Sequence, residues 1–440
     1  MESIIGNAGL SINKNGDPKQ TIGNCIKAIC YDARLKEMFR FNEMTGKTEI
    51  FGAWWNRLSN EICDNDVNNI RLYLEQNYGL SHEKNIPRAI DIISKQHPYH
   101  PIREYLNNLK WDGVKRIGEF LPKYLGAQRS AYTTAATQVF LMGAIERVFK
   151  PGIKYDLMLC IADTNQGGGK STIARFLAVK DEWFTDDLKR LDDENVYRKL
   201  QGHWVIEFSE MLATAKAKTV EDIKSFITRQ KDNYKLPYAI YSQDFPRQCV
   251  FIGTSNDLDF LPNDKSGNRR FVPVLANSKV ADKHPLDDEA ETRAYIDQLW
   301  AEAMYIYRNE KYQLTFPKEL QSELLEAQSE FTPENPKIGV IQKWLEDCPY
   351  TSVCSLMIYK EAFDGKEYQD PKDWELKEIS QIMNKHVSGW EKRQTKSQQK
   401  RFHKYGVQRA WDKIVNEKKS GDGFESVDNE AEQMELPFEQ

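Results

Sequence analysis

Long apolar runs are missing from this sequence. No stretch within its 440 residues is apolar and long enough to cross a bilayer, and the mean hydropathy is −0.67. Residues 1–20 are polar and lack the apolar segment and small-residue cleavage site of a secretory signal. We therefore expect a soluble, cytoplasmic protein, and the length predicts two or three domains.

Paired cysteine motifs and an excess of basic residues are also missing. The seven cysteines include no C-x-x-C pair of the kind that holds zinc or forms a redox couple, so we expect reduced, mostly buried thiols. The 61 lysine and arginine residues are outnumbered by 66 acidic residues, which gives a net charge of −5. This balance excludes a uniformly basic protein that coats DNA, so any basic surface must be regional.

The patterns that are present divide the chain into four regions. The first is helix-rich, with helical spacing of apolar residues at 68–78 and 89–94. In the second, apolar runs typical of buried strands alternate with helical patterns, which predicts an α/β fold. The third is small and increasingly basic, and the fourth is acidic and polar. We expect the regions to span 1–126, 127–331, 337–415 and 420–440, with strands at 157–161, 204–208, 250–253 and 271–274.

A glycine-rich loop carries the strongest chemical signal. The segment Thr164-Asn-Gln-Gly-Gly-Gly-Lys-Ser-Thr172 lies between a predicted strand and a helical pattern at 173–177, which is the setting of a phosphate-binding P-loop. Lys170 would bridge β and γ phosphate oxygens, and the Ser171 hydroxyl would bind Mg²⁺. Thr164 stands where the usual pattern has glycine. The predicted ATP site comprises Gln166, Gly167, Gly168, Gly169, Lys170, Ser171 and Thr172.

Two carboxylates lie near the end of the second apolar run, in the segment Trp204-Val-Ile-Glu-Phe-Ser-Glu210, with Glu207 near the end of the strand and Glu210 just beyond it. A P-loop site needs an acidic partner for the metal and a group that activates the attacking water. We expect Glu207 to contact the Mg²⁺ shell and Glu210 to act as the base, although the reverse assignment stays open.

An amide and two arginines complete the predicted catalytic set. Asn256 ends the third apolar run, where it would hold the attacking water or sense the γ-phosphate. Arg269 and Arg270 stand between a turn signal and the fourth run, and a guanidinium there would neutralise charge on a transferring phosphoryl group. The sequence leaves open which of the two arginines acts.

The order of these segments resembles the virulence-associated protein E family, whose core is similar to superfamily-three helicases of the AAA+ type. The resemblance rests on the glycine loop and on several flanking strings: His100-Pro-Ile-Arg-Glu-Tyr-Leu, Lys110-Trp-Asp-Gly113, Phe245-Pro-Arg-Gln248 and Gly267-Asn-Arg-Arg-Phe271. It implies a ring, expected to be a hexamer, that acts in replication of a phage or mobile element. The roughly 125 N-terminal residues show no primase metal site, so priming would need a separate primase.

Two basic segments are candidates for DNA contacts. The interval between the second and third strand runs mixes cations with tyrosines and, in relatives, bears a hairpin facing the ring's pore; we expect Lys231, Lys235 and Tyr238 to contact DNA there. The basic unit over 337–415 resembles a winged-helix module, with Lys400 and Arg401 on phosphate. A protein-docking role for this unit stays open.

The acidic tail ends in Gln433-Met-Glu-Leu-Pro-Phe438, which resembles the short peptide that docks on the bacterial sliding clamp. Gln433, Leu436 and Phe438 are the expected contacts.

The sequence thus predicts a Mg²⁺- and ATP-dependent DNA helicase or translocase. Two alternatives remain: a nucleotide-regulated replication initiator or scaffold that binds DNA without processive unwinding, and a toxin-like or immunity ATPase.

Overall fold

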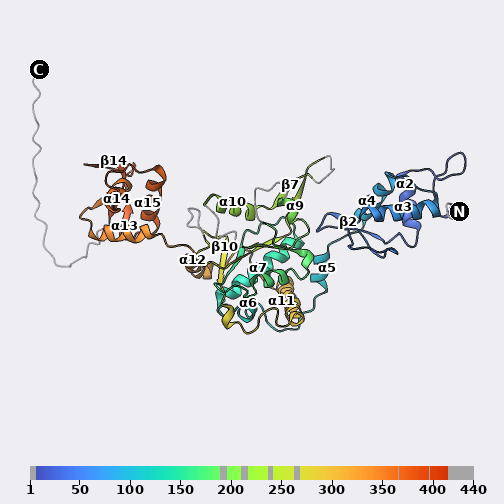
Figure 1. Cartoon of the computed structure of the whole chain (residues 1–440), viewed down its shortest axis with the longest axis horizontal. Coiled ribbons are helices and arrows are strands. Elements are labelled where there is room, and N and C mark those ends of the chain that lie inside the picture. Colours follow the sequence, from blue (N-terminus) through green and yellow to red (C-terminus); the bar gives the residue numbers. More distant parts are fainter. Residues whose placement is uncertain are drawn as a thin grey trace, which may run out of the picture. The chain divides into compact units, whose positions relative to one another are not determined.

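The structure is a computed structural model, and it describes residues 6–188, 196–209, 217–235, 241–261, 268–364, 366–395 and 397–414. The chain forms two compact units, Met1–Pro333 and Glu334–Gln440. Figure 1 follows the elements along the chain.

The first part of unit one packs helices against a small sheet around one apolar cluster. Both predicted helices are present as α3 and α4, and Pro101 begins α5 because proline fits the first turn of a helix. The sequence did not predict the sheet, whose order is β2-β1-β3. The elements are α2 (Ile22–Tyr31), β1 (Phe39–Asn42), β2 (Lys47–Ile50), α3 (Asp64–Tyr78), α4 (Asn85–Gln96), β3 (Pro98–Tyr99) and α5 (Pro101–Asn108).

A parallel five-stranded sheet in the order β10-β4-β9-β6-β5 forms the core of unit one. All four predicted strands are confirmed, with ends shifted by one or two residues. The sequence missed β5, which has only two residues. The strands are β4 (Met158–Ala162), β5 (Phe184–Thr185), β6 (Val205–Ser209), β9 (Val250–Ser255) and β10 (Phe271–Leu275).

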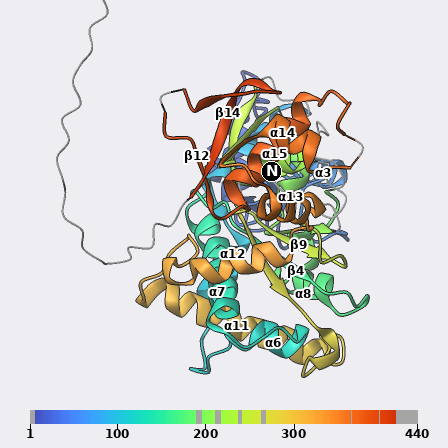
Figure 2. The same ribbon diagram turned by 90° about the vertical axis from the view of Figure 1, so that its left-hand side faces the viewer.

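Helices cover both faces of this sheet, which confirms the α/β prediction. Alternate strand residues enter different apolar clusters: Leu159 and Ile161 join the one that includes α7, α8 and α11, while Met158 and Cys160 join the one that includes α10. In Figure 2, α7 lies beside β4 and β9, and α11 packs on α7. The helices are α6 (Phe120–Leu125), α7 (Ala131–Phe149), α8 (Lys170–Leu177), α9 (Val196–Leu200), α10 (Ala217–Thr228), α11 (Glu289–Asn309) and α12 (Gln321–Glu330).

A separate antiparallel hairpin, formed by β7 (Lys231–Tyr234) and β8 (Gln243–Pro246), connects α10 to β9. It therefore leaves the core at the amino end of β9.

Unit two has its own apolar cluster, formed by helices on an antiparallel sheet in which β14 pairs with β11, β12 and β13. Its elements are α13 (Pro336–Asp347), β11 (Ser352–Cys354), α14 (Ser355–Glu361), α15 (Asp373–Lys385), β12 (Trp390–Lys392), β13 (Gln399–Phe402) and β14 (Gly406–Lys413).

The cysteine prediction is confirmed, since all seven thiols are free and only Cys30 and Cys63 are exposed. Within the described parts of the chain, no helix combines the length and apolar character needed to span a membrane.

Candidate functional site

The glycine loop lies at the carboxyl edge of the parallel sheet, between β4 and α8. Gly167 and Gly169 have positive φ angles of 73° and 87°, which glycine adopts without a steric penalty. Thr164 is not among the described non-glycine residues with positive φ. The departure from the usual pattern at Thr164 is therefore compatible with this loop, because that position does not require the left-handed backbone.

The Lys170 side chain is buried at the centre of this edge. Its ammonium nitrogen donates to the backbone oxygens of Asp163 and Asn165, at 3.0 and 3.3 Å, and to Asn256 Oδ1 at 2.9 Å. The parallel pairing of β4 with β9 sets Ala162 opposite Ser255, so Asn256 follows β9 at the level of the loop. The structure thus brings together the predicted lysine and amide.

Glu207 is the buried carboxylate of the site. Its Oε1 accepts from the Ser171 hydroxyl at 2.6 Å and from the Thr254 hydroxyl, while its Oε2 is buried with no partner among the described residues. Burial raises the pKa of Glu207, and the two hydroxyls partly offset that rise. A buried carboxylate oxygen without a partner is suited to bind a cation.

A segment after β10 packs against the glycine loop, which the sequence did not predict. Asp163 Oδ2 accepts from the Ser278 backbone N–H at 3.0 Å, and His284 Nε2 lies 3.1 Å from the Gly167 oxygen. A Cβ on Gly168 would lie 2.7 Å from Ser278 Oγ, so any larger residue there would force this segment to shift. Burial opposes ionisation of Asp163, but hydrogen bonds from Asn165 and Ser278 lower its pKa on balance.

A second carboxylate missed by the sequence reasoning is Asp186, directly after β5. Its negative charge contributes to the raised pKa of Glu207. The parallel pairing of β5 with β6 brings it to the same edge. The position after a strand was the available signal, but β5 was too short to recognise.

Comparison with protein families places the chain. The model of the virulence-associated protein E-like domain matches residues 106–333, slightly more than half of the sequence, and this segment includes the whole site described above. The chain belongs to the virulence-associated protein E-like family. The resemblance predicted from the motifs is therefore confirmed.

The chain is similar to the apo structure of the NrS-1 C-terminal region (305–718), with 16% identity, coverage of 78% of this chain and 82% of that chain, and a TM-score of 0.43. A second, the A form apo structure of the same region, gives 14% identity, 80% and 83% coverage, and a TM-score of 0.42. No curated protein matches.

In this virulence-associated protein E-like domain, both candidate arginines lie at the amino edge of the sheet. Phe271 is paired with Met158, and the Met158 N–H donates to the Arg270 oxygen at 2.8 Å. The five residues of β4 then span roughly 16 Å at about 3.3 Å per residue before the loop begins. The structure therefore does not bring the arginines to the glycine loop of their own chain.

The two arginines also differ from each other. Arg270 Nε donates to Thr228 Oγ1 at 2.9 Å and lies 3.9 Å from Asp156 Oδ2. Arg269 is exposed and makes no hydrogen bond or ion pair with the described part of the chain. Arg269 is thus the arginine whose guanidinium is accessible to another molecule.

The β7–β8 hairpin carries two of the predicted DNA contacts. Lys231 forms an ion pair with Asp244 on the opposite strand and lies where the hairpin leaves the core. Lys235 follows the end of β7 and is exposed, as is Tyr241 before β8. Of the two lysines, Lys235 is nearer the tip.

In unit two, the predicted pair lies on the β13–β14 hairpin with different surroundings. Lys400 Nζ donates to Ser352 Oγ at 2.8 Å, whereas Arg401 is exposed. Both border a cavity of about 330 Å³ with His403 and Lys404.

Some predicted positions lie outside the described residues, so their roles stay predictions. They are Glu210, Tyr238, Gln433, Leu436 and Phe438.

Proposed function

We propose that the protein is a Mg²⁺-dependent ATPase that moves along or unwinds DNA during replication of a phage or other mobile element. The observation that carries the proposal is the cluster of Lys170, Ser171, Glu207 and Asn256 at one edge of a parallel sheet, beside a loop whose glycines leave backbone N–H groups open to phosphate. The family supports the replication context.

The residues present fit a magnesium ion bound together with nucleotide. Ser171 Oγ and the unpartnered Glu207 Oε2 are oxygen ligands of the kind Mg²⁺ prefers. Among the described residues, no group of three or more His, Cys, Asp or Glu side chains suits a metal. Further ligands would therefore come with the nucleotide, and a bound ion would supply positive charge that neutralises the nucleotide's phosphates.

The remaining polar groups divide the work of hydrolysis. Lys170 would exchange its contacts with backbone oxygens and Asn256 for contacts with phosphate oxygens. Asn256, at the same edge of the sheet, would orient the attacking water. Because Glu207 is engaged with Ser171, we assign it to the metal and Glu210 to the base.

An arginine must come from a neighbouring subunit under this proposal. Arg269 lies a full strand length from the loop of its own chain. A head-to-tail ring, expected to be a hexamer, would set Arg269 of one subunit against the phosphate site of the next.

An ATPase assay with and without single-stranded DNA tests the proposal. We expect Mg²⁺-dependent turnover that DNA stimulates and that Lys170→Ala removes, alongside ATP-dependent strand displacement on a forked duplex. Unchanged turnover in Lys170→Ala would contradict the ATPase assignment. Tight DNA binding with turnover but no displacement would instead favour the replication initiator or scaffold.

A further inference from the structure

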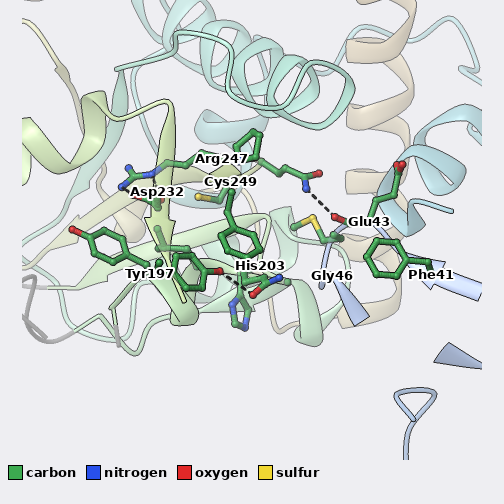
Figure 3. Close-up of a pocket in the computed structure, with 16 residues that line it drawn as sticks. Phe41, Glu43, Gly46, Tyr197, His203, Asp232, Arg247 and Cys249 are labelled. Atoms are coloured by element: carbon green, nitrogen blue, oxygen red, sulfur yellow. Dashed lines mark hydrogen bonds and ion pairs between the residues drawn. The ribbon is translucent and has the colours of Figure 1, made fainter. Parts of the chain in front are cut away.

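A cavity of about 210 Å³ lies at the amino edge of the core sheet, away from the glycine loop. Three parts of unit one line it: the turn after β1, the end of α9 with the residues that follow, and the base of the β7–β8 hairpin. Figure 3 shows these side chains around the space, with Glu43 and Phe41 on one side and Tyr197 and Asp232 on the other.

Aromatic rings dominate the hairpin side of this cavity. Tyr234 and Phe245 stack with ring centroids 4.2 Å apart and planes at 22°, and Tyr197 lies nearly parallel to Tyr234 at 6.4 Å and 18°. All three rings line the cavity and are only partly buried. Stacked faces of this kind receive another flat ring without regard to its sequence identity.

Two polar groups give the cavity a donor and an acceptor. The Gln201 oxygen accepts from the Tyr234 hydroxyl at 2.9 Å, which leaves its NH₂ group with no partner among the described residues. His203 donates from Nδ1 to the Lys199 oxygen at 2.8 Å, and burial lowers its pKa, so its Nε2 is an acceptor. The edge of a nucleobase carries complementary groups.

Positive charge surrounds the aromatic wall. Arg229 is exposed and lies over the Tyr197 ring, 5.3 Å from its centroid. Beneath the cavity, Arg247 is held by both oxygens of Asp232, at 2.7 and 2.8 Å. Arg147 is buried nearby, with Nε and Nη1 unpartnered among the described residues. Within the part of the chain that the structure describes, Asp232 pairs with Arg247 alone, so the Arg147 guanidinium adds a positive charge near the cavity, and this favours an anionic chain outside.

We propose that this cavity holds one unstacked base of a DNA single strand, while Arg229 contacts the adjoining phosphate. The proposal rests on the proposed function, because it assumes that the hairpin meets DNA. The size of the cavity agrees with a single base, since it is smaller than the roughly 300–1,000 Å³ of sites for drug-sized ligands.

The turn after β1 would also contact the base, because it lines the cavity. The Gln248 side-chain amide donates to the backbone oxygen of Glu43 at 3.0 Å, and its Oε1 lies 2.6 Å from His100 Nε2. These contacts join the turn to the residues that follow the β7–β8 hairpin. A base in the cavity would contact both the turn after β1 and the residues that follow β8.

The test compares two oligonucleotides, an oligothymidine and a strand of equal length made of abasic residues. Tyr197→Leu removes one ring, Phe245→Leu removes another in case the first variant fails to fold, and Tyr197→Phe keeps the ring. Tyr31→Leu, at an exposed tyrosine of α2 far along the chain from the cavity, is the matched control. Binding is measured by fluorescence anisotropy over a range of salt concentrations, and folding by thermal melting.

We expect each leucine variant at the cavity to weaken oligothymidine binding about 5- to 150-fold, the range for one lost base–aromatic stack. In Phe245→Leu, affinity for the abasic strand and the salt slope should not change, because the phosphate contacts remain. Tyr197→Leu also removes the ring and hydroxyl that hold Arg229, so its loss should still be larger for oligothymidine than for the abasic strand. Tyr31→Leu should bind as the wild type does. Tyr197→Phe keeps the ring but loses the hydroxyl that accepts from Arg229, so it should lose less oligothymidine affinity than Tyr197→Leu.

Equal oligothymidine affinity in wild type and cavity variants would overturn the inference alone. An equal loss for both strands would do the same, because it would indicate lost phosphate contacts. A wild type that binds neither strand would contradict this inference and the proposed function together.

Discussion

The two edges of the core sheet carry different chemistry. At the carboxyl edge, Lys170, Ser171, Glu207 and Asn256 contact one another and the glycine loop. At the amino edge, Arg269 is exposed and the β7–β8 hairpin leaves the core. The N-terminal part of unit one contacts the core at this edge as well.

One chain thus gathers the candidate phosphate-binding residues at one edge but holds its candidate arginine at the opposite edge. In parallel strands the two ends cannot exchange places without breaking the sheet. The arginine therefore acts on another subunit's nucleotide, or it does not act on nucleotide at all. The first of these possibilities is the account proposed above.

The largest effect is expected at the carboxyl edge. Lys170→Ala should reduce ATP turnover to background, because this lysine supplies the loop's positive charge to the β and γ phosphates. Steady-state phosphate release checks this, and a melting temperature close to wild type would show that folding survives. Lys231→Ala, which removes a lysine at the amino edge, should retain turnover without DNA.

The second-largest effect on turnover is expected at the amino edge. Arg269→Ala should lower turnover by about 10³-fold, the scale of a lost arginine finger. Arg270→Ala is the matched control: its loss of the Thr228 and Asp156 contacts should reduce stability more than catalysis. Turnover and urea unfolding of both variants check this, and the opposite order of effects on turnover would assign the finger to Arg270.

A pH effect tests how the amino edge is joined to the N-terminal part. Burial lowers the pKa of His100 to about 4, and its neutral ring accepts from the Arg103 N–H through Nδ1 while Nε2 faces Gln248. The unfolded chain takes up a proton near pH 6.5 but the folded chain does not. Stability is therefore complete above that pH and falls as pH decreases toward 4.

We expect a loss of about 2 kcal/mol by pH 5 from this residue. Urea unfolding of wild type and His100→Asn at pH 7.5 and pH 5 checks the value, since asparagine also caps helices but does not titrate. The wild type should lose more stability than the variant between the two pH values. Parallel losses would show that His100 is protonated in the folded chain.

The smallest effect concerns DNA. Lys235→Ala should weaken single-strand binding by about 3- to 10-fold and reduce the salt slope by about 1, as expected for one phosphate contact. Lys231→Ala should change affinity less, because Asp244 already neutralises it. Anisotropy titrations at several salt concentrations compare them, and a larger effect at Lys231 would place the DNA at the hairpin's base.

The sequence predicted the long strands and helices better than the short strands and the contacts between distant segments. The runs at 157–161 and 250–253 became β4 and β9 because continuous apolar segments suit strands buried on both faces. The short strands β1 and β5 were missed, since β1 mixes exposed and buried positions and β5 has two residues.

The site was predictable as far as it follows local pattern. Lys170, Ser171 and Glu207 each stand in a recognisable motif, and the structure brings them together. The contact of Ser278 with Asp163 depends on a return of the chain after 115 residues, which no spacing reveals. Strand direction likewise placed the arginines at the far edge, because they precede β10 and β10 runs parallel to β4. Periodicity does not encode strand direction.

The central claim is that a neighbouring subunit's arginine completes the phosphate site, and mixing two inactive variants tests it most directly. In an equal mixture of Lys170→Ala and Arg269→Ala proteins, one interface in four joins an intact loop to an intact arginine. We expect the mixture to recover about a quarter of wild-type turnover if the interfaces act independently. Turnover that stays at background, while both variants bind ATP and assemble, would contradict it.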